Sequence, residues 1–155
     1  MLGRKYSGYV GGITPATTDD NWTVEGAQGE FGRIIEVSWG GEATTSTAMR
    51  TRVQRSASQA GAGTAGDITE LGQPAGGAPL LAFFTTYATT QPTLDAGALF
   101  GTSWNAHGGV IRWLADPGEG FWIVGTAGTP AADQTISCRN DVGTATSSYA
   151  CVWEE

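Results

Sequence analysis

The chain contains little charge of either sign. Only 15% of its 155 residues are charged, against about a quarter in an average soluble domain. Lys5 is the one lysine among eight lysines and arginines, and His107 is the one histidine. The formal net charge is −7, whereas binding to nucleic-acid phosphates requires a basic surface. Nucleic acid is therefore not an expected direct partner.

Long hydrophobic runs are also missing. The longest, at residues 79–84, has the length of one strand and is far too short to cross a membrane. The first residues, MLGRKYSGYVGG, contain no apolar stretch of the kind found in secretion signals. We expect no membrane partner, and we expect the protein to be made and assembled in a cytosol.

Cysteine is scarce, with Cys138 and Cys151 as the two examples. Buried free thiols are the default state in a reducing compartment. A disulfide is the alternative if two late strands bring the Cα atoms within about 7 Å. Two cysteines and a distant histidine do not have the spacing of a zinc site, so we expect no metal or other cofactor.

No motif in the sequence indicates catalysis. His107 lies in a predicted turn, and no nucleophile elbow is present. A glycosidase needs two carboxyl groups that converge across a cleft, but the acidic pairs fall in turns or at the end of the chain, where acids usually serve as solvated turn formers. These pairs are Asp19/Asp20, Asp67/Glu70, Asp116/Glu119 and Glu154/Glu155. We therefore expect no enzymatic activity.

What the chain does contain is glycine and aromatic residues. It has 24 glycines, six tryptophans, five phenylalanines and four tyrosines, enough for turns and for the core of one domain over residues 1–155. About eight to ten short strands, separated by turns, predict an all-β fold: an antiparallel, jelly-roll-like sandwich or barrel. The strands are expected at residues 4–12, 19–25, 31–40, 49–56, 80–88, 98–104, 110–115, 121–126, 134–140 and 147–155.

Residues 31–56 carry the clearest strand pattern, because apolar and polar side chains alternate. One face of the first strand is expected to hold Phe31, Arg33, Ile35, Val37 and Trp39. The second strand is expected to place Met49, Thr51 and Val53 on one face and Arg50, Arg52 and Gln54 on the other.

These two strands would form a hairpin if they paired through residues 40–46. Val37 would then lie opposite Met49, and Glu36 would form a cross-strand ion pair with Arg50. The alternative is that each strand has a different neighbour, as is common in jelly rolls and Greek keys.

A second hairpin is predicted from the turn DPGEG at residues 116–120. It joins VIRWLA to FWIVGT, and proline and glycine favour the turn. Ile111 and Trp113 would lie on one face and Val110 and Leu114 on the other, so both faces are apolar. The hairpin is therefore either covered on both sides or in contact with another chain through one face.

Two segments are expected outside the regular sheets. Residues 1–12 are predicted to be an N-terminal arm or strand. Residues 57–79 are rich in glycine and alanine and predict a long surface loop that lies on the surface or against a partner.

Several stretches together resemble the head-decoration, or cement, proteins of tailed bacteriophages. They are Arg4 and Tyr6 of the arm, the ITP and TTDD link at 13–20, IIEVSWG at 34–40, MRTRVQR at 49–55, DIT at 67–69, ATTQPTL at 88–94 and VWE at 152–154. The resemblance implies a jelly-roll-like domain that sits as a homotrimer on the outside of the virion capsid. It also implies that the major capsid protein is the partner, whose adjacent subunits are clamped, and that there are no catalytic residues.

The candidate interface residues are Arg4, Lys5 and Tyr6 of the arm and Arg50, Arg52 and Arg55 of one strand. A solvated strand edge is the other interpretation of both sets. The enrichment of arginine over lysine fits fixed ion pairs at an interface, although biased codon usage would produce it too. The alternative function is a carbohydrate-binding β-sandwich of a tail fibre or adhesin, in which Trp104 or Trp122 stacks on sugars. A third hypothesis is that the chain is another part of a virion, such as a head fibre or a minor coat protein.

Overall fold

The computed structural model describes residues 3–58, 63–72, 77–87, 91–125 and 135–155. Within them the chain forms twelve strands and no helix, so none is present that could cross a membrane. The strands are β1 Lys5–Ile13, β2 Asp20–Glu25, β3 Phe31–Glu42, β4 Ala48–Ser58, β5 Gly63–Ala65, β6 Ile68–Leu71, β7 Ala82–Tyr87, β8 Thr93–Asn105, β9 His107–Leu114, β10 Phe121–Val124, β11 Thr135–Val142 and β12 Ser147–Glu154.

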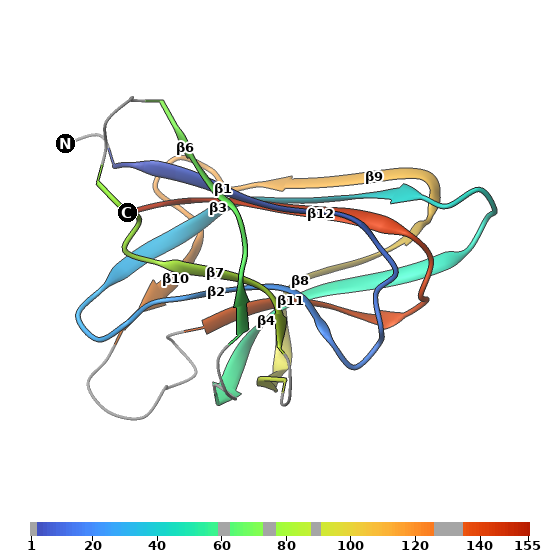
Figure 1. Ribbon diagram of the computed structural model, residues 1–155, viewed down its shortest axis with the longest axis horizontal. Coiled ribbons are helices and arrows are strands. Elements are labelled where there is room, and N and C mark those ends of the chain that lie inside the picture. The colour runs from blue at the N-terminus through green and yellow to red at the C-terminus, as the bar shows by residue number, and fades with distance from the viewer. Residues whose placement is uncertain (1–2, 59–62, 73–76, 88–90, 126–134) are drawn as a thin grey trace.

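The strands make two antiparallel sheets that pack face to face as an open sandwich (Figure 1). Sheet A has the order β10-β3-β12-β1-β6, with β9 also paired to β3. Sheet B has the order β5-β7-β2-β11-β4-β8. The predicted all-β, antiparallel, sandwich-like class is therefore confirmed, and the sheets do not close into a barrel.

The pairing pattern is that of a jelly roll. In sheet A the sequence β1-β12-β3-β9 and in sheet B the sequence β2-β11-β4-β8 wrap around each other, so that the first strand pairs with the last and the second with the last but one. Consecutive strands consequently tend to lie in opposite sheets. The short strands β5, β6 and β7 are inserted between β4 and β8 and extend both sheets at one edge.

This topology overturns the predicted hairpin between β3 and β4, which lie in different sheets. Glu36 pairs instead with Arg112 of β9, at 2.7 Å between carboxylate Oε1 and guanidinium Nε, and Arg50 pairs with Asp141. The alternative in which each strand has a different neighbour is the correct one.

A bulge at Ile35 shifts the alternation of inward and outward side chains along β3 by one residue. Ile34 lies opposite Trp153 and Glu36 lies opposite Val152, so Ile35 has no partner on β12. Ile34 and Val37 are fully buried, whereas Phe31 is 60% exposed. The prediction that Phe31, Arg33 and Ile35 share the buried face with Val37 and Trp39 is therefore wrong in the first half of the strand.

On β4 the predicted faces are largely correct. Met49, Thr51 and Val53 are buried, and Arg50 and Arg52 point to solvent. Gln54 departs from the prediction because the register against β8 shifts at this point, and its side-chain amide is buried against the Asp95 carbonyl.

The predicted hairpin at DPGEG is also wrong, although the turn itself is present. The Glu119 amide donates to the Asp116 carbonyl, and Gly118 has a φ of 90°. The strands on either side do not pair with each other. Both β9 and β10 pair with the same edge of β3, one after the other, with residues 115–120 as an excursion between them.

The predicted loop at 57–79 and the predicted arm are both partly built into the sheets. Residues 63–65 and 68–71 of the loop are strands β5 and β6, and residues 59–62 and 73–76 lie outside the described residues. Residues 5–13 form β1, between β12 and β6 in sheet A. The N-terminal segment thus has a strand on both edges over Lys5–Gly8 and on one edge, β12, after that.

Aromatic side chains fill the space between the sheets. Tyr6, Trp153 and Phe83 form a stack, with ring centroids 5.9 Å apart in the first pair and 6.1 Å in the second. Gly8 makes room for this stack, because a Cβ atom there would lie 2.5 Å from the Phe83 ring. The packing of this stack therefore depends on the absence of a side chain at Gly8, on the inner face of β1.

Candidate interaction surfaces

A line of exposed apolar side chains follows one edge of sheet A. We call it the apolar rim, and it consists of Phe31 (60% exposed), Val110 (76%), Leu114 (60%), Trp122 (46%) and Val124 (44%). Large contiguous apolar surfaces are uncommon on monomers and often mark interaction sites. The rim is therefore the first candidate for a functional surface.

The rim arises from strand alternation on β9 and β10. Val110 and Leu114 point outward, while Trp113 between them points toward the core. Trp122 and Val124 likewise point outward around the buried Ile123. These strands occupy the edge of the sheet, so both an apolar face and an unpaired strand edge meet solvent there in the described structure.

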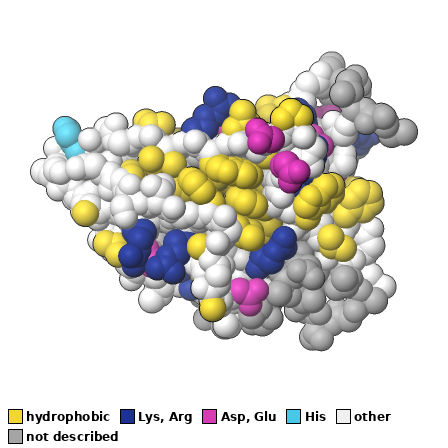
Figure 2. All heavy atoms as spheres, turned by 180° about the vertical axis from the view of Figure 1, so that it is seen from behind, with side chains coloured by type: hydrophobic (Ala, Val, Ile, Leu, Met, Phe, Trp, Pro, Cys, Tyr) yellow, Lys and Arg dark blue, Asp and Glu magenta, His cyan; other side chains and the backbone are white. Residues whose placement is uncertain are grey.

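On the same side of the molecule, β9 of sheet A faces β8 of sheet B along one edge of the sandwich, which we call the seam. Phe100 of β8 contacts Trp113 of β9 across the seam, with centroids 6.1 Å apart, and Trp113 stacks on Phe121 at 4.1 Å. Figure 2 views this side, where hydrophobic side chains form a band across the middle of the surface. Partly buried aromatic rings thus extend the apolar rim into the seam.

On the outer face of sheet A beside the rim, positive and negative side chains are present in equal number. Ser38, Gly40 and Ala150 help line a shallow groove between Tyr9 and Val110 of about 170 Å³. The charged side chains on this face are Lys5, Arg33, Arg112, Glu36, Glu42 and Glu154. Their formal charges cancel, so the net charge of −7 resides on other parts of the chain.

Two ion pairs organise these charges. Arg112 donates from Nε and a terminal nitrogen to the two carboxylate oxygens of Glu36, at 2.7 and 2.9 Å. Arg33 donates to Glu154, and its guanidinium carbon lies 5.4 Å from the centroid of the Trp122 ring. Arg33 is therefore both an ion-pair partner and a cation over an aromatic ring of the rim.

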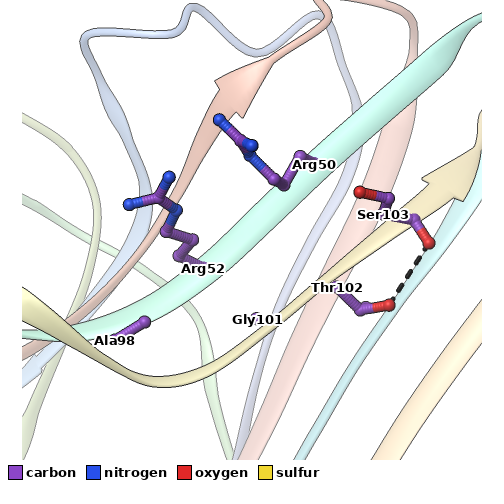
Figure 3. Close-up of a pocket in the computed structure, with 6 residues that line it drawn as sticks. All are labelled: Arg50, Arg52, Ala98, Gly101, Thr102 and Ser103. Carbon is purple, nitrogen blue, oxygen red and sulfur yellow. Dashed lines mark hydrogen bonds between the residues drawn. The ribbon is translucent and has the colours of Figure 1, made fainter.

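A second candidate surface lies on the outer face of sheet B. Arg50 and Arg52 of β4 extend side by side on the side of the strand away from Gly101, Thr102 and Ser103 (Figure 3), and together with residues of β8 they border a hollow of about 350 Å³. We call it the arginine hollow, and it is lined by Arg50, Arg52, Ala98, Gly101, Thr102 and Ser103. Gly101 is the cross-strand partner of Arg52, and because it has no side chain, the hollow is not filled at this position.

One carboxylate serves both arginines. Arg50 Nε donates to the two carboxylate oxygens of Asp141 at 2.7 and 2.9 Å, and Arg52 also forms an ion pair with Asp141. Asp141 reaches them because the register between β11 and β4 shifts at this residue. The hydrogen bonds that Arg50 donates to Asp141, and then the negative charge of that carboxylate, raise the pKa of Arg50 above its ordinary value.

The structure separates the predicted interface residues. Arg4 and Lys5 are exposed, but Tyr6 is 1% exposed and its hydroxyl donates to the Gly77 carbonyl, so its side chain belongs to the core. Arg50 and Arg52 share the hollow. Arg55 lies elsewhere, where its guanidinium donates to the Trp122 carbonyl at 2.8 Å and so joins β4 of sheet B to β10 of sheet A.

Buried polar groups join the two sheets in the core. The Asn140 side-chain oxygen accepts hydrogen bonds from Thr51 at 2.7 Å, Tyr149 at 3.1 Å and Asn21 at 3.2 Å. Burial raises the pKa of Tyr149 to about 12. Trp104 donates to Thr51 and is 8% exposed, so it is a core residue and is not available to stack on a sugar.

Three further titratable groups are buried. Asp20 accepts from Arg139 Nε at 2.7 Å, and burial nevertheless raises the pKa of its carboxyl group. Cys138 and Cys151 are free thiols on β11 and β12, and burial raises the pKa of both. These groups lie inside the sandwich and contribute to no surface.

The other residues considered for catalysis or metal binding do not come together in one site among the described residues. His107 begins β9 at a sharp corner, where its Nδ1 lies 3.0 Å from the Ala43 carbonyl. Among the residues that the structure describes, no three histidine, cysteine or acidic side chains form a group able to hold a metal ion.

The sequence indicated part of the apolar rim and of the arginine hollow. The two-faced apolar pattern of β9 was visible, whereas Phe31 joined the rim through the bulge, and Asp141 met the arginines through tertiary pairing.

Comparisons of the chain with protein-family models, curated proteins and solved structures returned no match.

Proposed function

We propose that this chain is a structural decoration, or cement, protein of a tailed-bacteriophage head. In this proposal it binds the outside of the capsid as a homotrimer, clamps adjacent major capsid subunits and performs no catalysis. It is assembled in the cytoplasm of the host bacterium and remains on the virion. The apolar rim is the observation that carries the proposal, because it leaves large apolar side chains without cover in the single chain.

The rim fits contact between copies of the chain. Leu114 and Val110 project from an edge strand of sheet A, and the formal charges on the outer face of that sheet cancel, so two copies can approach without like-charge repulsion. A stable interface buries about 1,200–2,000 Å² in total, which the rim could supply together with the outer face of sheet A beside it. Repeated contacts around a shell would add avidity to each weak one.

The jelly-roll core supports the same proposal. Decoration requires a rigid scaffold that presents surfaces, and the two sheets are held together by stacked aromatic rings and by the hydrogen bonds of Asn140. The sequence resemblance to decoration proteins supplies the identity of the proposed partner, the major capsid protein.

The test is binding to heads of the phage that encodes the chain. Purified protein is mixed with undecorated, expanded heads and separated on a density gradient, and the copies bound per head are counted. We expect saturable binding, a copy number divisible by three, and heads that survive higher temperature. Absence of binding to these heads, or of a major capsid protein gene in the same genome, would refute the proposal.

Carbohydrate binding is the second candidate, and Trp122 is the residue that favours it. Its indole is 46% exposed beside Phe31 and Val124, which form an apolar platform suited to a sugar ring. Titration with a glycan panel, followed by tryptophan fluorescence, tests it. A saturable spectral shift that disappears in Trp122→Ala would support sugar binding, and no shift with any glycan would exclude it for that panel.

A further inference from the structure

The arginine hollow differs in its stoichiometry from three other ion pairs of the described residues. Arg33 with Glu154, Arg112 with Glu36 and Arg139 with Asp20 each combine one guanidinium with one carboxylate. In the hollow, two guanidinium groups share Asp141. A local excess of one positive charge therefore stands on a chain whose net formal charge is −7.

The arginines also retain hydrogen-bond donors. A guanidinium group has five N–H donors in a planar fork. Arg50 uses Nε toward Asp141, and Arg52 uses one terminal nitrogen. The Arg50 side chain is 46% exposed and that of Arg52 is 35% exposed, so their other N–H groups can meet a ligand from solvent.

The space beside these donors is shaped by small residues. Ala98 and Gly101 leave the hollow open next to Arg52, and Ser103, the cross-strand partner of Arg50, brings a hydroxyl group to the same face (Figure 3). The hollow is shallow, so it fits one side chain of a partner and does not enclose a small molecule.

We propose that the arginine hollow binds a carboxylate side chain, Asp or Glu, of a partner protein. One added carboxylate gives two guanidinium groups and two carboxylates, which is a neutral cluster with bidentate geometry. A phosphate dianion would instead place an excess negative charge beside Asp141. The site is independent of the apolar rim; within the proposed function, on which this last step rests, the carboxylate belongs to a capsid subunit.

The experiment is an NMR titration that follows the arginine Nε–H signals. The probe is N-acetyl-glutamate N-methylamide, with inorganic phosphate in a parallel series at equal ionic strength. We expect saturable shifts of Arg50 and Arg52 in the millimolar range with the glutamate probe. Arg112 is the matched control, since it is an exposed arginine that already has its own carboxylate, Glu36, and its signal should move less than a third as far.

Two variants sharpen the result. Asp141→Asn removes the competing carboxylate, so it should tighten probe binding by at least about fivefold, whereas Arg52→Gln should abolish it. No saturable shift, equal shifts at Arg112, or weaker binding by Asp141→Asn would overturn the proposal. Tighter binding of phosphate than of the glutamate probe would overturn the carboxylate assignment.

This test is separate from the test of the proposed function. Probe binding without binding to heads would refute the capsid role and leave the carboxylate site standing. Head binding that is unaffected by Arg52→Gln would remove the hollow from the capsid contact while leaving the decoration role intact.

Discussion

Trp113 and Phe121 stack face to face, with ring centroids 4.1 Å apart and planes inclined by 8°. They belong to different strands, β9 and β10, which follow each other along the same edge of β3. The stack therefore joins the two strands across the excursion of residues 115–120. Phe100 adds a contact from the opposite sheet, so this cluster closes the seam beneath the apolar rim.

Removal of the Phe121 ring should open this seam. Phe121→Ala is expected to lower the free energy of unfolding by about 2 kcal/mol, because a half-buried ring loses apolar burial and its stacking partner. Urea unfolding at a fixed protein concentration measures the change. Leu80→Ala is the control, since the Leu80 side chain is 52% exposed and should cost less than about 0.5 kcal/mol. Equal losses in both variants would contradict a structural role for the stack.

Self-association should depend on Leu114. The wild-type protein is expected to have a solution mass of three times 16.0 kDa. Leu114→Ser removes apolar area from the rim and should weaken association by at least about tenfold. Leu71→Ser makes the same chemical change at a site that is 42% exposed on β6, at the opposite edge of sheet A, and should leave association unchanged. Sedimentation equilibrium over a concentration series measures both, and a monomeric wild type at the highest concentration would speak against the rim as a contact between copies.

Alkaline pH should destabilise the fold through Tyr149. Burial raises its pKa to about 12 from a reference value of 10.0, so the folded state favours the neutral phenol. Its contribution is complete below pH 10 and is lost as the pH rises toward 12, because the unfolded state ionises first. The loss amounts to about 2–3 kcal/mol over this window.

Urea unfolding between pH 9 and 12 measures this effect. Tyr149→Phe should make the free energy of unfolding fall less steeply with pH, and the remaining slope comes from the two buried thiols, whose pKa values are also raised. The substitution should cost about 1 kcal/mol for the lost hydrogen bond to Asn140. Tyr9→Phe, at a tyrosine that is 61% exposed, should keep the wild-type slope. An unchanged slope in Tyr149→Phe would show that another group controls alkaline unfolding.

Both thiols should be inert in the folded protein. Cys138 and Cys151 are at most 1% exposed, and burial raises the pKa of each, so neither accessibility nor thiolate formation favours reaction. At pH 8 a thiol reagent should label neither cysteine in the native state and both in 6 M guanidinium chloride. Rapid labelling of one native thiol would contradict its buried position. A failure to label both after denaturation without a reductant would reveal a disulfide.

Local order in the sequence was sufficient to predict the strands other than β5 and β6, and several of their faces. Met49, Thr51 and Val53 alternate with Arg50 and Arg52, and this period of two placed the first three inside and the arginines outside, as observed. Glycine-rich turns and aromatic strands likewise indicated an all-β sandwich. These signals are local because strand alternation depends on neighbouring residues alone.

Tertiary structure decided which strands meet and which candidate residues reach the surface. Ile35 bulges because β12 pairs Trp153 with Ile34 and Val152 with Glu36, and this turns Phe31 outward. Tyr6 is buried because β1 lies inside sheet A, and Asp141 meets Arg50 because β11 pairs with β4. Alternation predicted the two faces of a strand wherever no bulge interrupted it, as along residues 49–53, but the partner that covers a face comes from a distant part of the chain, so only the packed sheets determined which apolar face remained open.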